Sequence, residues 1–418
     1  MGGVSMEWKE VRLGDVCEIK HGFAYKGKYF SDTPTCDILV TPGNFTLSGG
    51  FKLDKPKFYN GPVEKDYILS KGDLIVTMTD LSKNIDTLGY SALVPEVKGL
   101  TFHHNQRIGL VENIANNVDK YFLYWIMRTP AYQSFIATHS SGTTVHHTSP
   151  KGIGNYVFKL PPLDDQRRIA SILSSLDRKI ELNNKINADL EEMAQAIFKN
   201  WFVDFEPFKD GKFVDSELGM IPEGWKVGRL DEIADVVGGS TPSKAKPEYY
   251  TQKGIAWLTP KDLSNHPAVY TSRGEIDITE EGYNSTSTKL MPKGTVLFTS
   301  RAPIGYISIA QNDICTNQGF KSLVPKKAGT CFLYCFLKYV TPEIENKSTG
   351  STFKEASGSL MKSLQVIIPE QKDFEDFEEI VSPLFARIES LEKENSRLSL
   401  LRDTLLPRLM SGEIEIPE

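Results

Sequence analysis

The sequence predicts an α+β protein, in which two globular domains of mixed α/β structure are separated by two long antiparallel coiled-coil helices. Three observations predict this fold class. The chain repeats itself with a pseudo-two-fold internal repeat, two segments have the spacing of a coiled-coil seam, and short strand-like runs precede each of those segments. With 418 residues, the chain is also too long for one ordinary core.

The internal repeat joins five early segments to five later ones. The offset between them drifts from 217 residues at the first pair to 208 at the helices, which places insertions and deletions in loops. The pairs are WKEVRLGDV and WKVGRLDEI from Trp8 and Trp225, LVTPGNF and WLTPKDL from Leu39 and Trp257, KGDLIVT and KGTVLFT from Lys71 and Lys293, GYSALV and GYISIA from Gly89 and Gly305, and NQR and NQG from Asn105 and Asn317.

Domain boundaries follow from this repeat. Runs such as DLIVTM and TVLFTS lie between Gly, Pro and Asn residues and predict strands, and KYFLYWIMRT and CFLYCFLKYV predict a helix in each domain. We expect a first domain at 1–160, a central helical segment at 161–205, a connecting segment at 206–222, a second domain at 223–368, and a C-terminal helical segment with a tail at 369–418.

Both helical segments place apolar residues at alternating spacings of three and four, as a coiled-coil seam does. In the second helix Asn395 and Arg402 occupy two seam positions, and in the first Asn183 and Asn184 interrupt the apolar series. The predicted pairing positions are Ile169, Leu173, Leu176, Ile180, Ile186, Leu190, Met193 and Ile197 in the first helix, and Phe377, Val381, Leu384, Ile388, Leu391, Leu398, Leu405 and Leu409 in the second.

A seam this narrow leaves apolar surface in water unless the helix has a partner, and the nearest candidate is the other helix. About 37 residues at 1.5 Å each would make a rod of roughly 55 Å. Pro383 predicts a kink or a late start of the second helix, and Pro407 and Gly412 mark its end. The alternative is that both are ordinary surface helices folded back on their own domains.

Charge alternates along the chain. Residues 1–160 carry 17 Lys and Arg against 15 Asp and Glu, and residues 223–365 carry 17 against 14, whereas 161–222 carry 8 against 12 and 366–418 carry 6 against 13. The total of −6 argues against indiscriminate nucleic-acid binding. No apolar run approaches the roughly 20 residues that span a bilayer, so we expect a cytoplasmic protein.

Motifs of common catalysts are absent from the sequence. It has no phosphate-binding Gly-x-x-x-x-Gly-Lys-Ser/Thr loop, no Gly-x-Gly-x-x-Gly turn after a strand, no Asn-Pro-Pro-Tyr stretch and no His-Glu-x-x-His helix. The paired histidines lack the i, i+4 spacing of a metal site, so we expect no metal. The sequence therefore predicts no catalytic residues and no cofactor bound by this chain.

Basic, amide and histidine side chains gather in matching loops of the two domains. Arg and Lys suit guanine edges and phosphates, Asn and Gln suit adenine edges, and imidazoles can donate to either kind of group. The candidate DNA-binding residues are Lys26, Lys28, Lys83, Asn84, His103, His104, Asn105, Gln106, Arg107, His146, His147 and Lys151 in the first domain, and Lys244, Lys246, Lys261, Arg301, Asn317, Gln318, Lys321 and Lys354 in the second.

Over essentially its whole length the chain resembles the specificity subunit of type I restriction-modification systems. The segments that carry the resemblance are LPPLDDQRRIASILSSLDRKIELNNKINADLEEMAQAIF from Leu160, FEPFKDGKFVDSELGMIPEGWKVGRL from Phe205, SRAPIGYISIA with TNQGF, and the closing LRDTLLPRLMSG. The combination of the Pro-Leu-x-x-Gln-Arg helix start with the Ile-Pro-Glu-Gly-Trp stretch is specific.

The resemblance implies that two target recognition domains each read one half of a split sequence in double-stranded DNA. It implies that the helices set the unread spacer and dock two methyltransferase subunits, which bind S-adenosylmethionine. Whether two motor and nuclease subunits, which use ATP and Mg²⁺, also join is left open. The specificity subunit itself performs no chemistry, and its spacer should follow helix length.

One departure from the family pattern is the start of the second helix, IPEQKDFEDFEEI, which lacks the Gln-Arg-Arg of the first. Docking of the two methyltransferases is therefore expected to be imperfectly symmetric. Two rival functions are an enzyme, with a nuclease or methyltransferase fused to DNA recognition domains, and a non-enzymatic protein-interaction rod with repeated ligand-binding domains.

Overall fold

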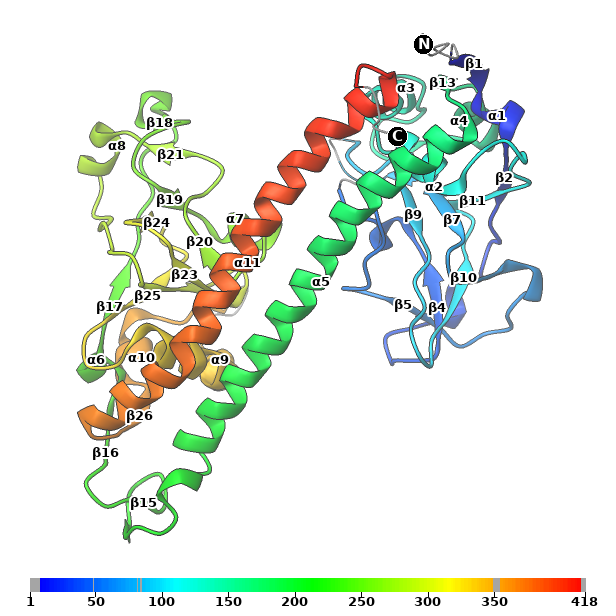
Figure 1. Ribbon diagram of the computed structural model, residues 1–418. Helices are drawn as coiled ribbons and strands as arrows, with labels where there is room; N and C mark the ends of the chain where they lie inside the picture. Colours follow the sequence, from blue (N-terminus) through cyan, green and yellow to red (C-terminus); the bar gives the residue numbers. More distant parts are fainter. Residues whose placement is uncertain (1–7, 48, 81, 83–84, 349–353, 415–418) are drawn as a thin grey trace, which may run out of the picture. The chain divides into compact units, whose positions relative to one another are not determined.

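A computed structural model describes residues 8–47, 49–80, 82, 85–348 and 354–414 (Figure 1). The chain divides into two compact units. The first unit contains Met1–Lys179 and Arg397–Glu418, and the second contains Ile180–Ser396. Each unit therefore holds one globular domain and a part of each long helix.

The first unit is built on a four-stranded sheet of order β2-β11-β7-β9 and a five-stranded sheet of order β3-β5-β4-β10-β6. The buried helix α2 (Lys120–Ile126) packs in the core beside α3 (Pro130–Thr138), and α4 (Pro150–Gly154) is a single turn. The strands are β1 (Lys9–Arg12), β2 (Glu18–His21), β3 (Phe30–Ser31), β4 (Asp37–Val40), β5 (Lys57–Tyr59), β6 (Ile68–Leu69), β7 (Leu74–Thr77), β8 (Thr79–Asp80), β9 (Ser91–Leu93), β10 (Thr101–His104), β11 (Ile108–Glu112), β12 (His146–His147) and β13 (Val157–Leu160), and α1 (Leu13–Val16) follows β1.

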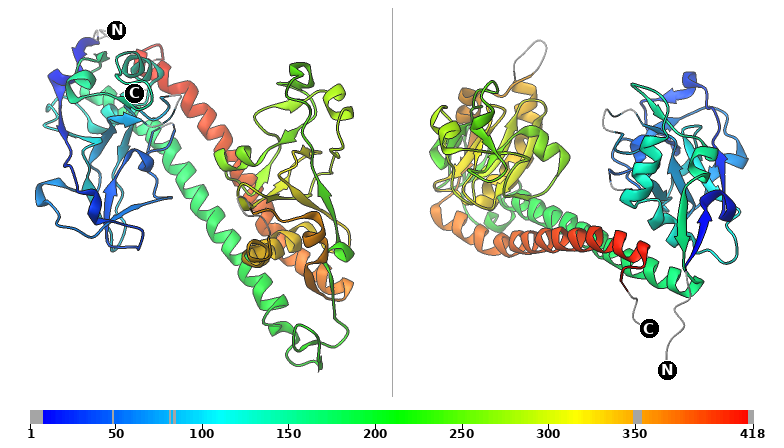
Figure 2. Two further views of the ribbon diagram at one scale, coloured as in Figure 1. Left: turned by 180° about the vertical axis from the view of Figure 1, so that it is seen from behind. Right: turned by 90° about the horizontal axis from the view of Figure 1, so that it is seen from above.

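The second unit repeats this plan with a five-stranded sheet of order β17-β25-β22-β23-β20. The buried helix α9 (Thr330–Lys347) lies against this sheet (Figure 2). The strands are β14 (Phe213–Val214), β15 (Ile221–Pro222), β16 (Lys226–Arg229), β17 (Ala234–Gly238), β18 (Tyr250–Thr251), β19 (Trp257–Leu258), β20 (Tyr270–Thr271), β21 (Asp277–Ile278), β22 (Val296–Ser300), β23 (Ile304–Ala310), β24 (Cys315–Thr316), β25 (Lys321–Pro325) and β26 (Gln365–Ile368), and the short helices are α6 (Leu230–Ile233), α7 (Pro260–Asn265), α8 (Glu280–Asn284) and α10 (Gly358–Ser363).

The internal repeat predicted from the sequence is confirmed in the strand pairing. The neighbours β2-β11-β7-β9 of the first unit match β17-β25-β22-β23 of the second. The antiparallel pair β1–β13 matches β16–β26, and the parallel pair β4–β10 matches β19–β24. Strands predicted at DLIVTM and TVLFTS are β7 and β22. The two domains are thus two copies of one topology with different loops.

Two long helices run through both units. Helix α5 (Leu163–Phe202) begins two residues after Pro161, and helix α11 (Gln371–Ser411) ends directly before Gly412, whose φ of +75° suits glycine. Within each unit the helices pair in antiparallel fashion. In the first unit Asp177 meets Arg402, and in the second Phe202 packs on Phe377 (Figure 1).

Most of the predicted seam positions are buried or half-buried. The buried ones are Ile169, Leu173, Phe377, Val381, Ile388, Leu391 and Leu409. The half-buried ones are Leu176, Ile180, Ile186, Leu190, Ile197, Leu384, Asn395, Leu398 and Leu405.

Two details of the predicted helices are wrong. Met193 is 52% exposed, because Ala194 and Phe198 fill the seam one position later. Pro383 does not delay the second helix, which begins at Gln371. Asn183, the polar residue that interrupts the apolar series, lies buried in the seam, and its amide donates to Asn395 Oδ1 at 2.9 Å.

Among the residues that the structure describes, no helix is long and apolar enough to cross a membrane. In the same part of the chain, no group of three or more His, Cys, Asp and Glu side chains could hold a metal ion.

Candidate nucleic-acid interface

Three backbone hydrogen bonds hold the candidate loops of the first domain together. Phe23 N donates to His104 O at 2.9 Å, Met78 N donates to Arg107 O at 2.9 Å, and Thr148 N donates to Met78 O at 3.0 Å. They connect the loop after β2, the end of β7, the turn between β10 and β11, and the loop before α4. We call these three bonds, and their counterparts in the second domain, the loop frame.

The second domain has the same loop frame at the positions that the repeat predicts. Ser240 N donates to Thr316 O at 2.9 Å, Ser300 N donates to Gly319 O at 2.7 Å, and Ala356 N donates to Ser300 O at 2.9 Å. Because only main-chain atoms take part, the frame is the same although almost every side chain on it differs. Both domains therefore present the same four segments of backbone side by side.

An asparagine turn stands in the middle of each frame. Asn105 Oδ1 accepts the Arg107 amide at 3.1 Å, and Asn317 Oδ1 accepts the Gly319 amide at 2.8 Å. A side-chain oxygen that bonds the amide two residues on is typical of tight turns. In both turns the next residue, Gln106 or Gln318, is exposed. The asparagines therefore shape the turn, and the glutamines are the side chains that it offers to a ligand.

A glycine crosses each asparagine turn at close range. A Cβ added to Gly22 would lie 2.1 Å from Asn105 O, and one added to Gly239 would lie 2.2 Å from Asn317 O. Real Cβ atoms do not approach a carbonyl oxygen so closely. Glycine is required at both positions by this approach of two backbone segments.

In the first domain, the frame brings several predicted residues to one hollow of about 310 Å³. Gln106, Arg107 and His147 line it together with His21 and Thr79. His147 Nδ1 and Thr79 Oγ1 lie 3.1 Å apart across the β8–β12 pair. The hollow carries amide, guanidinium, imidazole and hydroxyl groups, all of which can hydrogen-bond to base edges or phosphates.

In the second domain, the frame gathers charges instead. Arg301 Nη1 lies 3.3 Å and Lys321 Nζ lies 3.5 Å from the two carboxylate oxygens of Glu355. Gln318, in the asparagine turn, accepts a hydrogen bond from the Thr241 hydroxyl. Two of the predicted residues, Arg301 and Lys321, thus meet at Glu355, between the end of β22 and the start of β25.

The prediction that His103 and His104 contact DNA directly is wrong. Both side chains are completely buried. His103 Nε2 lies 2.6 Å from Asp37 Oδ1, and His104 Nε2 lies 2.8 Å from Ile108 O. Burial lowers the pKa of His104 to about 4, so it is neutral near pH 7 and donates to the carbonyl. These histidines belong to the core that supports the turn. Asn105 is also buried, in the turn role already described.

The remaining predicted residues are spread around the frame rather than within it. His146 is half-buried beside Asp80 in the β8–β12 pair. Lys83 and Asn84 lie outside the described residues. Exposed lysines occupy the outer loops, some held by a neighbour: Lys28 over the Tyr29 ring, Lys246 on the Tyr249 hydroxyl, Lys261 near Glu275, Lys354 near Glu345 O, and also Lys26, Lys151 and Lys244.

Sequence reasoning missed four residues of the assembled site, which are His21, Thr79, Thr241 and Glu355. Three of them lack a local signal, because a single His or Thr in a loop is common. Glu355 carried one signal, since the 208-residue offset that relates the helices also relates it to His147. The predicted DNA-binding residues are basic, amide and histidine side chains, so a carboxylate, which repels the phosphates of DNA, was not among them.

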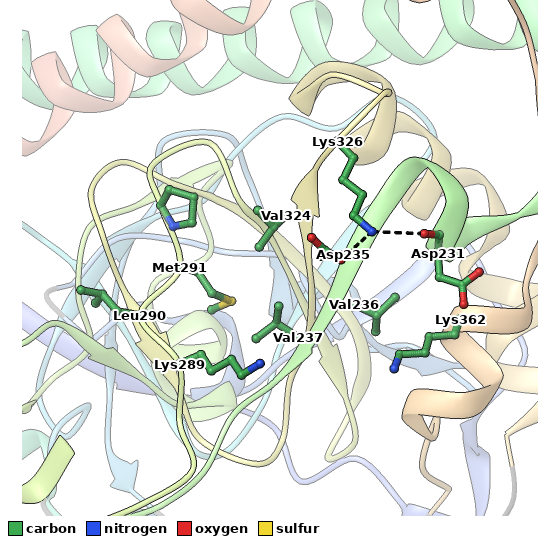
Figure 3. A pocket seen from close by; sticks show the side chains of 11 residues that line it. Asp231, Asp235, Val236, Val237, Lys289, Leu290, Met291, Val324, Lys326 and Lys362 are labelled. Atoms are coloured by element: carbon green, nitrogen blue, oxygen red, sulfur yellow. Dashed lines mark hydrogen bonds and ion pairs between the residues drawn. The ribbon is translucent and has the colours of Figure 1, made fainter. Parts of the chain in front are cut away.

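A second hollow, of about 630 Å³, lies elsewhere on the second domain (Figure 3). Valines of β17 and β25 and Met291 form its apolar part, and Lys326 pairs with Asp235 at 2.6 Å beside it. It adjoins the start of β17 and the end of β25, whereas the loop frame adjoins the end of β17 and the start of β25. This hollow is therefore at the opposite end of the sheet from the candidate interface.

Comparison with known proteins places these observations in a family. The model of the type I restriction modification DNA specificity domain matches residues 6–192 and 222–400. The chain is 27% identical to the HindI specificity subunit of Haemophilus influenzae, over 98% of this chain and 100% of that protein. It is 40% identical to the MjaIX specificity subunit of Methanocaldococcus jannaschii, over 45% of this chain and 44% of that protein.

A solved structure shares the fold. It is the crystal structure of a type I restriction-modification S subunit from M. genitalium, with a TM-score of 0.58 and 17% identity, over 98% of both chains. The two matched stretches of the family model each contain one domain and most of the helix that follows it.

Proposed function

Because this chain belongs to the type I restriction modification DNA specificity family, it is the specificity subunit of a type I restriction-modification system, and we propose that each of its domains reads one half of a bipartite DNA target. The observation that carries the proposal is the loop frame, which occurs twice with different side chains on it. One frame repeated with different hydrogen-bonding groups is what two readers of two different short sequences require.

The helices would set the distance between the two half-sites. Helices α5 and α11 have 40 and 41 residues and pass without a break from one unit into the other. At 1.5 Å per residue each is about 60 Å long, enough to bridge successive major-groove faces, which recur about every 34 to 36 Å. An unread spacer of fixed length in the target would follow from two rigid helices of fixed length.

As a specificity subunit, the chain acts in an assembly with DNA and with other restriction-modification subunits. We propose two methyltransferase subunits docked on the acidic helices, with two motor and nuclease subunits joining where the system also restricts DNA. S-adenosylmethionine, ATP and Mg²⁺ would be bound by those subunits, none by this chain. The assembly would act in the cytoplasm, where the DNA is.

This chain would contribute recognition and no catalysis. The groups at its loop frames are donors and acceptors suited to base edges and phosphates. Incubation of the purified chain with DNA, S-adenosylmethionine and Mg²⁺ should give neither methylated nor cleaved DNA. Turnover by the chain alone would contradict this part of the proposal.

The test of the whole function is a base-resolution map of adenine methylation. The chain would be expressed with the methyltransferase subunit of its system in cells that lack other methyltransferases. We expect one motif of two short blocks around a fixed unread spacer, absent when this chain is omitted. A stable complex that methylates no new motif would instead favour a protein-interaction role.

A further inference from the structure

We propose that Arg301 and Glu355 together read a G·C base pair in the half-site of the second domain, and that Lys321 positions Glu355 for this. The inference rests on the proposed function and deepens it, because it assigns one base pair to two named side chains. Their places on the loop frame, their geometry and the contrast with the first domain carry it.

The loop frame fixes which residues correspond in the two domains. Thr148 and Ala356 make the same bond to the end of β7 and of β22, so His147 and Glu355, one residue earlier, occupy one position. Arg301 follows Ser300 as Thr79 follows Met78, so Arg301 and Thr79 occupy a second position. In both domains the side chains at these two positions meet, at 3.1 Å for Thr79 and His147 and at 3.3 Å for Arg301 and Glu355.

The charge cluster of the second domain is half-open to solvent. The side chains of Arg301 and Glu355 are 36% and 39% exposed, whereas Lys321 is 17% exposed. Arg301 donates one of its five N–H groups to Glu355, and each carboxylate oxygen of Glu355 has one contact. Arg301 therefore retains donors, and Glu355 retains acceptor positions, for a ligand. Lys321 is more buried than the other two side chains and contacts the carboxylate oxygen of Glu355 that Arg301 does not.

A G·C pair offers complementary partners to such a pair of side chains. In the major groove, guanine presents two acceptors, O6 and N7, that suit a guanidinium, and cytosine presents an N4 amino group that suits a carboxylate. An arginine and a glutamate in mutual contact can therefore address both bases of one pair. A·T pairs offer one acceptor and one donor on adenine, which a guanidinium cannot match bidentately.

The first domain lacks this combination. At the equivalent positions Thr79 and His147 carry no carboxylate, and the residue that corresponds to Lys321 is Gly109. Its guanidinium, Arg107, stands in the asparagine turn, where the second domain has Gly319. We therefore expect substitutions at the Arg301–Glu355 pair to change one half of the target and to leave the other half untouched.

The experiment compares methylation maps of wild type with those of Glu355→Gln and Arg301→Gln, each coexpressed with the methyltransferase subunit. Both variants should relax the requirement for G·C at one position of the same half-site, with discrimination at that base pair falling roughly fivefold to 150-fold. Arg107→Ala, in the first domain, should alter the other half and so identify which half each domain reads. Lys362→Ala, beside the hollow at the opposite end of the sheet, is the charge-matched control and should leave the motif unchanged (Figure 3).

Competition binding covers a variant that methylates too little DNA to map. The purified complex of each variant is titrated with duplexes that carry each of the four base pairs at every position of the half-site. The inference is overturned if the wild-type motif is bipartite yet both variants retain full discrimination, or if they affect the half that Arg107→Ala affects. A wild type without any bipartite motif would instead overturn the proposed function.

Discussion

At the scale of single residues, the interface consists of positions that the backbone fixes and positions that it leaves free. Gly22 and Gly239 are fixed, because a Cβ would collide with a carbonyl of the asparagine turn. His104 is fixed for a different reason, since its imidazole fills the core beneath the turn and bonds to Ile108 O. Gln106 and Gln318 are free, because their side chains leave the turn that Asn105 and Asn317 shape.

Burial of His104 makes the first domain sensitive to acid. Its folded-state pKa, about 4, lies below the ordinary value of 6.5, so protonation favours the unfolded chain. The free energy of unfolding therefore keeps its full value above pH 6.5. It decreases as the pH falls toward 4, by about 3 kcal/mol in total from this histidine. The free energy of unfolding, measured with denaturant, should fall less between pH 7 and pH 4.5 for His104→Gln than for wild type. The glutamine amide of this variant can still donate to Ile108 O. Parallel pH profiles would contradict the assignment.

Replacing the crossing glycine should damage recognition without unfolding the domain. Gly239→Ala forces the loop after β17 away from the asparagine turn, because the added methyl group would overlap Asn317 O. We expect binding to the specific duplex to weaken at least tenfold, while the melting temperature changes little. Gly219→Ala is the control, since nothing lies within 4 Å of its added Cβ. Its φ of +94° gives it a backbone penalty that Gly239 does not have, and no collision, so the control isolates the effect of the close approach. Equal binding by both variants would argue against a role for the close approach.

At the scale of elements, the two long helices contact each other through an apolar seam that is interrupted at a few positions by polar contacts. Asn183 is buried and donates to Asn395 and to Glu394, and Asn395 donates to Asn184 at 2.8 Å. In the first unit, Asp177 accepts from Arg128 at 2.9 Å and from Arg402 at 2.7 Å. Polar groups in a seam are satisfied in one alignment only, so they select the register.

Removal of the Asp177 charge should destabilise the first unit. In Asp177→Asn two guanidiniums, with side chains 3% and 12% exposed, would lose their shared carboxylate. We expect about 3 kcal/mol less protection against hydrogen exchange in α2 and in residues 163–179. The matched control is Asp403→Asn, which also removes a partner of Arg402 but from a site 59% exposed, and it should change protection by less than about 1 kcal/mol.

The elements also show what a sequence can predict. Periodicity predicted both helices and most of the seam, because one seam residue in every three or four is a strong signal. It misplaced Met193, because Ala194 and Phe198 offer nearly the same spacing and only packing decides between them. Composition predicted where the loops would be and that Arg301, Gln318 and Lys321 would face a ligand. The meeting of Arg301 and Lys321 at Glu355 depends on hydrogen bonds between distant backbone segments, which no local pattern encodes.

At the scale of the whole molecule, two copies of one domain are linked by helices that belong to both units. The proposed spacer role predicts that longer helices give a longer target. Seven residues inserted after Lys179 and seven after Ser396 fall at the unit boundaries and leave the Asn183–Asn395 and Asp177–Arg402 contacts intact. Each insertion lengthens its helix by about 10 Å, which corresponds to about three base pairs.

Methylation mapping of this double insertion should return the same two half-sites around a spacer about three base pairs longer. Seven residues inserted after Asp210, in the connecting segment, lie outside both helices and should leave the spacer unchanged. An unchanged spacer in the double insertion would rule out the helices as the measuring element, and altered half-sites would show that the domains are not independent readers.

The loop frame also bears on how new targets arise. All its bonds join main-chain atoms, so mutations that replace the side chains at its tips need not disturb the fold that supports them. A lineage can therefore explore new recognition sequences at little risk to folding. Because the frame exists twice, one half can drift while the other is kept, and a stock of variants for each half yields a number of possible targets equal to their product.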